Sequence, residues 1–106
     1  MTSIYTAIIA NLLSISERQI EKTIGLLAEG ATIPFISRYR KEVTGGLDEV
    51  QIEQIKIQWE KLKELTKRKE TILKSIDEQG KLSDDLKKRI EETWDGTVLE
   101  DLYLPY

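Results

Sequence analysis

The sequence predicts an all-α fold. Apolar residues recur at helical spacing along nearly the whole chain, helix-capping residues stand between these runs, and no segment has the pattern of a strand. The 106 residues suffice for one small domain. We therefore expect a single domain in which short N-terminal helices, arranged as a hairpin like a helix-turn-helix, pack on one long helix, followed by a shorter C-terminal helix. The expected ranges are 1–44 for the short helices, 48–79 for the long helix, and 83–106 for the C-terminal helix with an extended tail.

The first 44 residues divide into three short predicted helices. A wide apolar stripe indicates the first; it consists of Ile4, Ile8, Ile9, Leu12, Leu13 and Ile15. Ser16 and Gln19 form a capping box that starts the second helix, and Gly30 ends it. Thr32 caps the third, whose apolar face is expected to hold Ile36, Tyr39 and Val43 before Gly45 and Gly46 break the pattern.

A long helix follows the double glycine. Asp48 and Gln51 form its capping box, and no proline or glycine appears from Glu49 until Gly80. About thirty helical residues would extend roughly 46 Å at 1.5 Å per residue. A compact chain of this size has a radius of gyration near ~13 Å, so the helix is longer than its own domain can bury.

The last quarter of the chain predicts one more helix and a tail. Ser83 is the expected N-cap of this helix, and Leu86, Ile90 and Trp94 recur at four-residue steps. Thr97 and Glu100 offer a capping box for a short final turn. The pair Leu104-Pro105 favours an extended end, and the aromatic tail "LYLPY" is expected to dock on neighbouring helices or a following domain.

The composition excludes several classes of function. There are 16 Lys and Arg against 19 Asp and Glu, and neither Cys nor His. The common general base, the thiolate nucleophile and most transition-metal ligands are therefore missing, so we expect no enzyme, no cofactor and no metal site. The apolar run "IYTAIIANLLSI" has no basic region before it, contains Asn11 and is too short to span a bilayer. We expect a cytoplasmic protein without a membrane partner.

Arg38, Arg40 and Lys41 are the first candidates for a nucleic-acid contact. Side chains three apart on one helix could reach successive phosphates, with Tyr39 as a stacking surface. The alternative places Tyr39 in the core and pairs the cations with acids such as Glu42. The residues alone favour this structural alternative, because three cations form only a small cluster.

Lys67, Arg68 and Lys69 are the second candidates. They lie in "TKRKET", a polar waist between the apolar clusters of the long helix. Residues 56–74 carry seven cations and three acids, a net charge of +4, whereas residues 75–106 carry four cations and nine acids, a net charge of −5. These cations could face a phosphate backbone. Alternatively, Glu64 pairs with Arg68, or the acidic C-terminal helix folds back and neutralises the waist.

Three ordered blocks resemble a known family. "TIPFISRYRKEVTGGLDEVQI", "SIDEQGKL" and "LEDLYLPY" are similar to the N-terminal region of the Tex family of bacterial transcription accessory proteins, over about Leu27 to Tyr106. Members of that family are much longer: an RNase H-like domain, helix-hairpin-helix motifs and a C-terminal OB-fold RNA-binding domain follow the helical region.

The resemblance implies that this chain is an N-terminal scaffold fragment. Its partners would then be RNA or DNA through the full-length protein, the later domains of the same chain, and the transcription machinery. Two hypotheses follow. In the first, the fragment adds an auxiliary phosphate contact to a nucleic-acid-binding protein. In the second, it is a protein-interaction module that docks the transcription machinery or the later domains and does not touch nucleic acid.

Overall fold

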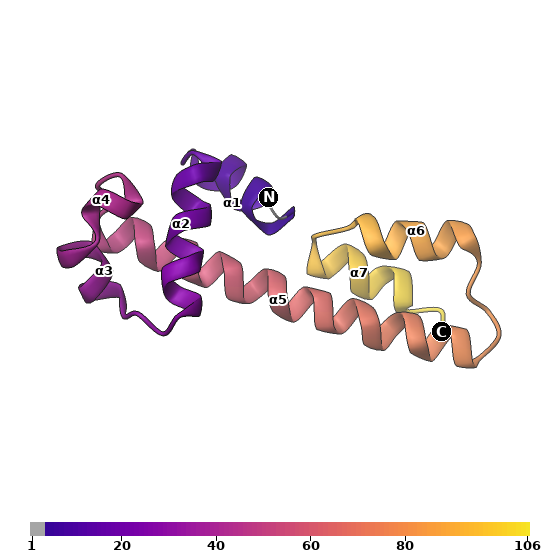
Figure 1. Ribbon diagram of the computed structural model, residues 1–106. Coiled ribbons are helices and arrows are strands. Elements are labelled where there is room, and N and C mark those ends of the chain that lie inside the picture. The colour runs from indigo at the N-terminus through magenta and orange to yellow at the C-terminus, as the bar shows by residue number, and fades with distance from the viewer. Residues whose placement is uncertain (1–3) are drawn as a thin grey trace. The chain divides into compact units, whose positions relative to one another are not determined.

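The computed structural model describes residues 4–106, and within that range it contains helices and no strand, as predicted (Figure 1). Residues 1–3, which belong to the predicted 1–44 segment, lie outside the described part. The helices are α1 Ile4–Leu13, α2 Glu17–Ala28, α3 Ile33–Tyr39, α4 Lys41–Thr44, α5 Glu49–Glu78, α6 Asp84–Glu92 and α7 Gly96–Tyr103.

The chain forms two compact units, and α5 contributes to both. The N-terminal unit ends at Lys61, and the C-terminal unit extends from Leu62 to Tyr106. Each unit has its own buried apolar residues. The expectation that the whole chain behaves as one domain stays a prediction.

The N-terminal unit is a helical hairpin, α1 and α2, followed by the short helices α3 and α4 and the first half of α5. Ser16 caps α2 as predicted, since its hydroxyl accepts a hydrogen bond from the Gln19 N–H at 3.2 Å. The Gln19 side chain also donates to the Thr44 carbonyl at 3.1 Å, which ties α2 to the end of α4. The core of this unit is rich in isoleucine; its most buried apolar residues are Ile9, Ile20, Ile36, Leu47, Ile52 and Ile55.

The apolar stripe predicted for the first helix is wrong in detail. Ile9 is fully buried, but Ile4 is 57% exposed and Leu12 is 59% exposed. Thr6, which the stripe left out, is buried instead. α1 packs on α2 with a narrow face, so Ile4 and Leu12 stay largely in solvent, while Ile8, Leu13 and Ile15 are half-buried.

α5 begins and ends as the sequence predicts. Asp48 Oδ1 accepts from the Gln51 N–H at 2.7 Å, and Gln51 Oε1 accepts from the Asp48 N–H at 3.0 Å. This reciprocal box satisfies two N–H groups that the helix itself cannot pair. The helix has 30 residues. Gly80, with φ of 69°, follows its last turn and allows the chain to reverse.

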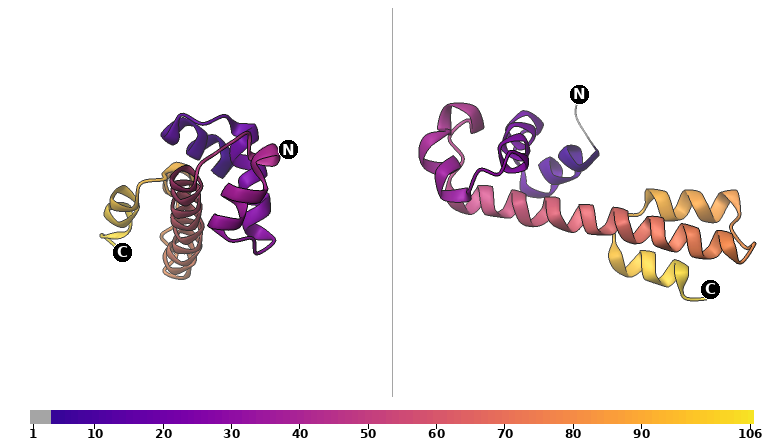
Figure 2. Two further views of the ribbon diagram at one scale, coloured as in Figure 1. Left: turned by 90° about the vertical axis from the view of Figure 1, so that its left-hand side faces the viewer. Right: turned by 60° about the horizontal axis from the view of Figure 1, so that its bottom comes forward.

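The C-terminal unit packs α6 and α7 along the second half of α5 (Figure 2). Its core joins α5 to both shorter helices through Ile72, Ile76, Ile90 and Leu99. Ser83 caps α6 as predicted, because its hydroxyl accepts from the Leu86 N–H at 3.1 Å.

Three expectations for the C-terminal unit are wrong. α6 ends at Glu92, so Trp94 lies beyond the helix. Asp95, not Thr97, caps the last helix, and its carboxylate accepts from the Thr97 N–H at 2.8 Å and the Val98 N–H at 3.3 Å. The tail is helical up to Tyr103 rather than extended, since this cap starts α7 at Gly96.

Candidate nucleic-acid interface

The junction between α3 and α4 carries the first group of predicted cations. Thr32 caps α3, accepting from the Phe35 N–H at 3.3 Å. The helix stops at Arg40, whose φ of −130° and ψ of 30° interrupt the helical backbone before α4 begins at Lys41. The prediction that Arg38 and Lys41 share one helix is therefore wrong, although both still belong to the same short segment.

Two aromatic rings lie on the surface of α3. The ring centroids of Phe35 and Tyr39 are 5.5 Å apart with the rings tilted by 46°. Phe35 is 39% exposed and Tyr39 is 62% exposed. We call these two residues the aromatic pair. The alternative that placed Tyr39 in the core is wrong, because Ile36 and Ser37 are the residues that α3 buries.

Arg40 is held against the aromatic pair. Its guanidinium carbon lies 4.9 Å from the centroid of the Phe35 ring, a cation–π arrangement. One of its N–H groups donates to the Tyr39 carbonyl at 2.9 Å. Since guanidinium carries five N–H donors, others remain for an anion. Arg40 is thus a cation held over one of the two exposed rings.

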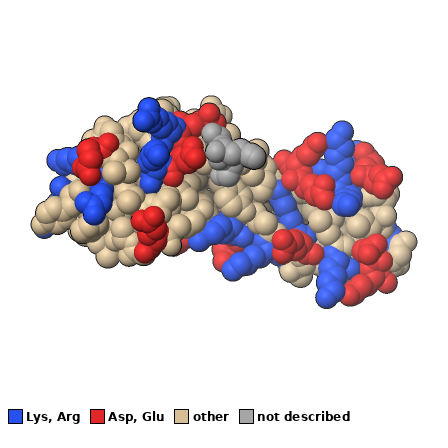
Figure 3. All heavy atoms as spheres, in the orientation of Figure 1, with Lys and Arg blue, Asp and Glu red and all other residues tan. Residues whose placement is uncertain are grey.

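Arg38 and Lys41 are exposed on either side of Tyr39 in the sequence. Within residues 4–106 neither forms an ion pair, so the local pairing with Glu42 that the alternative expected is absent from the described structure. Arg38, Arg40 and Lys41 together are called the α3–α4 cations. On the face drawn in Figure 3, Lys and Arg stand among Asp and Glu over each unit, so this face carries no extended cationic patch.

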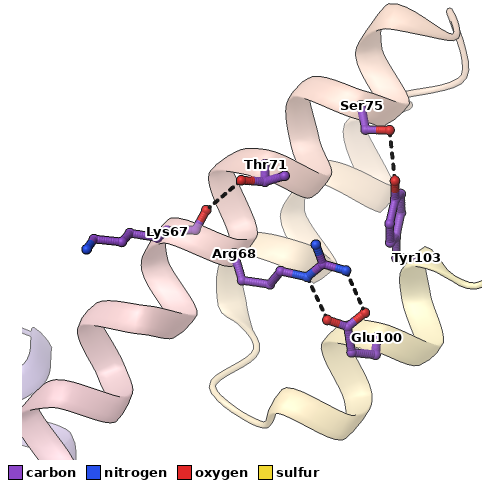
Figure 4. A network of polar contacts seen from close by, with 6 residues as sticks. All are labelled: Lys67, Arg68, Thr71, Ser75, Glu100 and Tyr103. Atoms are coloured by element: carbon purple, nitrogen blue, oxygen red, sulfur yellow. Dashed lines mark hydrogen bonds and ion pairs between the residues drawn. The ribbon is translucent and has the colours of Figure 1, made fainter.

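The second group of predicted cations is used largely within the fold. Arg68 forms a bidentate ion pair with Glu100, at 2.7 Å and 3.0 Å (Figure 4). The hydrogen bond from Arg68 lowers the pKa of Glu100 below its ordinary value, and the same bond raises the pKa of Arg68. Glu64, the predicted partner of Arg68, pairs instead with Lys67, with 3.8 Å between Glu64 Oε1 and Lys67 Nζ. The acidic C-terminal segment does fold back on this part of α5.

Lys69 is buried rather than projecting from the helix. It is only 6% exposed, its ammonium donates to the Glu91 carbonyl at 2.8 Å, and the same nitrogen lies 3.2 Å from the Trp94 ring centroid. Burial lowers its pKa. The structure therefore does not bring Lys67, Arg68 and Lys69 together as one cationic surface. Lys67 is 76% exposed, whereas Arg68, 42% exposed, is already bound by Glu100.

Two contacts were not predicted from the sequence. The signal for the aromatic pair was present, because Phe35 and Tyr39 are four apart and such residues meet on a helix surface. No local signal announced the contact of Lys69 with Trp94, which joins distant positions. Residues 4–106 contain no group of acidic, Cys or His side chains suited to a metal ion, and no helix there is both long and apolar enough to cross a membrane.

Comparison with known proteins identifies relatives of the chain. The family model for the Tex-like protein N-terminal domain matches residues 3–77. The chain is 55% identical over 101 residues to the transcriptional accessory protein Tex of Neisseria gonorrhoeae, which covers 95% of this chain and 13% of that protein. It is 50% identical over 106 residues to protein YhgF of Escherichia coli strain K12, which covers 100% of this chain and 14% of that protein.

A more distant relative is found in animals. S1 RNA-binding domain-containing protein 1 of Homo sapiens is 32% identical over 83 residues, which covers 78% of this chain and 8% of that protein. The chain thus spans only a small part of the length of the relatives it matches. With the family model covering well over half of its residues, the chain belongs to the Tex-like family and contains that family's N-terminal domain.

Proposed function

We propose that this chain is the helical scaffold at the N-terminal end of a nucleic-acid-binding transcription accessory protein, and that the α3–α4 cations add an auxiliary phosphate contact. The name of one relative includes an RNA-binding domain, and another is named a transcriptional accessory protein. In this function the chain carries out no catalytic step and acts in the cytoplasm. RNA or DNA would be its partner through the longer protein.

The exposure and the contacts of the three cations are the main support for the phosphate contact. Arg38 and Lys41 are exposed without an ion pair in the described structure, and Arg40 is ordered against Phe35. Arg and Lys in this state can replace the counterions of a phosphate backbone. Arg68 and Lys69 lack this freedom, because each is bound to its own unit.

Fluorescence anisotropy of the chain with single-stranded RNA and duplex DNA, from low to physiological salt, tests the proposal. We expect salt-sensitive binding that the triple variant Arg38→Ala/Arg40→Ala/Lys41→Ala loses. A matched control removes three exposed cations elsewhere in the N-terminal unit: Arg18→Ala/Lys22→Ala/Lys61→Ala. Equal weakening in both triple variants would show that binding depends on net charge and not on a specific contact of the α3–α4 cations. Absence of binding at low salt would refute the phosphate contact.

A second candidate function is docking of a protein, either the transcription machinery or later domains of a longer chain. It is favoured by apolar side chains left in solvent, among which Ile4, Leu12 and Leu104 are 57%, 59% and 83% exposed. Apolar docking depends weakly on salt, whereas phosphate contact weakens steeply as salt rises. The salt series above therefore separates the two functions.

A further inference from the structure

We propose that the α3–α4 junction binds a single strand of nucleic acid by stacking an unpaired base on Tyr39, while the α3–α4 cations hold the neighbouring phosphates. The inference rests on the proposed function and deepens it, because it names the class of nucleic acid. It concerns residues 35–41 of the N-terminal unit alone.

The stacking surface is the ring of Tyr39. The Phe35 ring is partly covered, since the Arg40 guanidinium lies over it at 4.9 Å. Tyr39 is 62% exposed and meets Phe35 at an angle rather than face to face. Phe35 thus supports one side of Tyr39, and much of the Tyr39 ring stays in solvent. An exposed ring that is braced in this way offers a flat apolar surface of the kind on which bases stack.

The cations lie next to Tyr39 along the chain. Arg38 precedes Tyr39 directly, Arg40 follows it, and Lys41 begins the next helix. The Arg40 guanidinium donates to the backbone carbonyl of Tyr39 at 2.9 Å and lies over the neighbouring Phe35 ring, which holds this cation close to Tyr39. Proteins that bind single strands without reading sequence combine these same two elements, a cationic path for the backbone and an aromatic side chain for the base.

The same geometry disfavours a duplex. In a duplex each base face is already covered by its neighbours, so Tyr39 could gain a stacking contact only after a base leaves the helix. The cations could still touch duplex phosphates, but without a contribution from the ring. Affinity for a single strand should therefore exceed affinity for a duplex at equal salt, and Tyr39 should account for the difference.

The test measures anisotropy of the whole chain with four probes: oligouridylate, oligodeoxythymidylate, an abasic deoxyribose phosphodiester of the same length, and a DNA hairpin duplex. The variants are Tyr39→Leu, which keeps an apolar side chain without a ring, and Tyr39→Phe, which keeps the ring. Tyr106→Leu is the matched control, since Tyr106 is an exposed tyrosine of the other unit. Circular dichroism checks that each variant keeps its helices.

We expect Tyr39→Leu to weaken binding of the base-bearing single strands by about five-fold or more, and Tyr39→Phe to retain it. Binding of the abasic strand and of the duplex should be unchanged in both variants. The inference is overturned if Tyr39→Leu binds both base-bearing strands as tightly as the unchanged chain does. It is also overturned if the unchanged chain binds the abasic strand as tightly as the base-bearing strands. Loss in the triple cation variant alone would overturn stacking and leave the proposed function standing, whereas absence of all binding would overturn both.

Discussion

The guanidinium of Arg68 in α5 binds both carboxylate oxygens of Glu100 in α7, at 2.7 Å and 3.0 Å (Figure 4). Arginine has the same fork geometry toward carboxylate and phosphate, so a cation that the sequence offers for nucleic acid is engaged by an acid of its own chain. Tyr103 lies beside this pair, with its ring centroid 5.4 Å from the Arg68 guanidinium and its hydroxyl 2.9 Å from Ser75 Oγ.

The Arg68–Glu100 pair should make the stability of the C-terminal unit depend on pH. Its hydrogen bond lowers the pKa of Glu100 below the ordinary 4.5, so the pair stabilises the fold above that pH and this contribution is lost as the pH falls through the lower, folded-state pKa. Glu100→Gln should therefore lower the melting temperature at about pH 7, and the difference from the unchanged chain should shrink as the pH falls below the ordinary pKa of glutamate. Glu92→Gln controls for the loss of one exposed charge. A constant difference at every pH would contradict the account.

Lys69 should stabilise the C-terminal unit through its ammonium. The group binds the Glu91 carbonyl, one of the last four of α6, which the helix itself cannot pair, and it also lies over Trp94. Lys69→Ala should lower the free energy of unfolding by about 2 kcal/mol, and Lys69→Met, which keeps the apolar stem, by less. Urea denaturation measures both, with Lys74→Ala, an exposed lysine of the same helix, as control. Equal effects of Lys69→Ala and Lys74→Ala would refute this role.

Replacing either glycine of the pair before α5 should destabilise the fold, for a different reason at each position. Gly46 has φ of 88° with open space around it, so Gly46→Ala should cost about 1 kcal/mol from backbone strain alone. Gly45 has φ of 74°, and an added Cβ would also lie 2.9 Å from Gln19 Nε2, so Gly45→Ala should cost more.

Gly25 lies inside α2 with free space around it, so Gly25→Ala should instead stabilise the chain by about 0.5–1 kcal/mol. Thermal denaturation should give this order of stabilities, and any other order would contradict it.

The cap of α5 gives a prediction that the sequence and the structure share. Asp48→Ala removes the acceptor of the Gln51 N–H and should cost about 1 kcal/mol. An unchanged melting temperature would mean that this cap does not stabilise the start of α5.

The cap of α7 separates the sequence-based prediction from the structure. Asp95→Ala removes the acceptor of two N–H groups and should cost about 1 kcal/mol, whereas Thr97→Ala should have little effect. Chemical denaturation of the two variants measures the difference. A larger loss for Thr97→Ala would show that the helix starts where the sequence first suggested.

The sequence predicted those features of the fold that depend on neighbours in the chain. The caps at Ser16, Asp48 and Ser83 were all correct, because a capping side chain binds an N–H two or three residues later. The start and end of α5 were predicted for the same reason. The cap of α7 was assigned to Thr97 instead of Asp95, and Asp95-Gly96 also has the composition of a turn.

Features that depend on distant contacts or on backbone geometry could not be predicted. Arg40 breaks the third helix with φ of −130° although neither proline nor glycine stands there. The burial of Lys69 requires Trp94 and Glu91, which are far along the chain and come close only when α6 packs on α5. For the candidate site, the cations could therefore be predicted from the sequence. Which of them already bind groups of their own chain could be seen only in the structure.

The salt dependence of binding to a single strand tests the central claim, that the α3–α4 cations contact phosphate. The logarithm of the binding constant should fall linearly with the logarithm of salt concentration, and the triple variant Arg38→Ala/Arg40→Ala/Lys41→Ala should reduce the slope by about 2, at about 0.7 per phosphate on a single strand. The control Arg18→Ala/Lys22→Ala/Lys61→Ala should keep the slope of the unchanged chain. The same slope for the unchanged chain and the α3–α4 triple variant would contradict the claim.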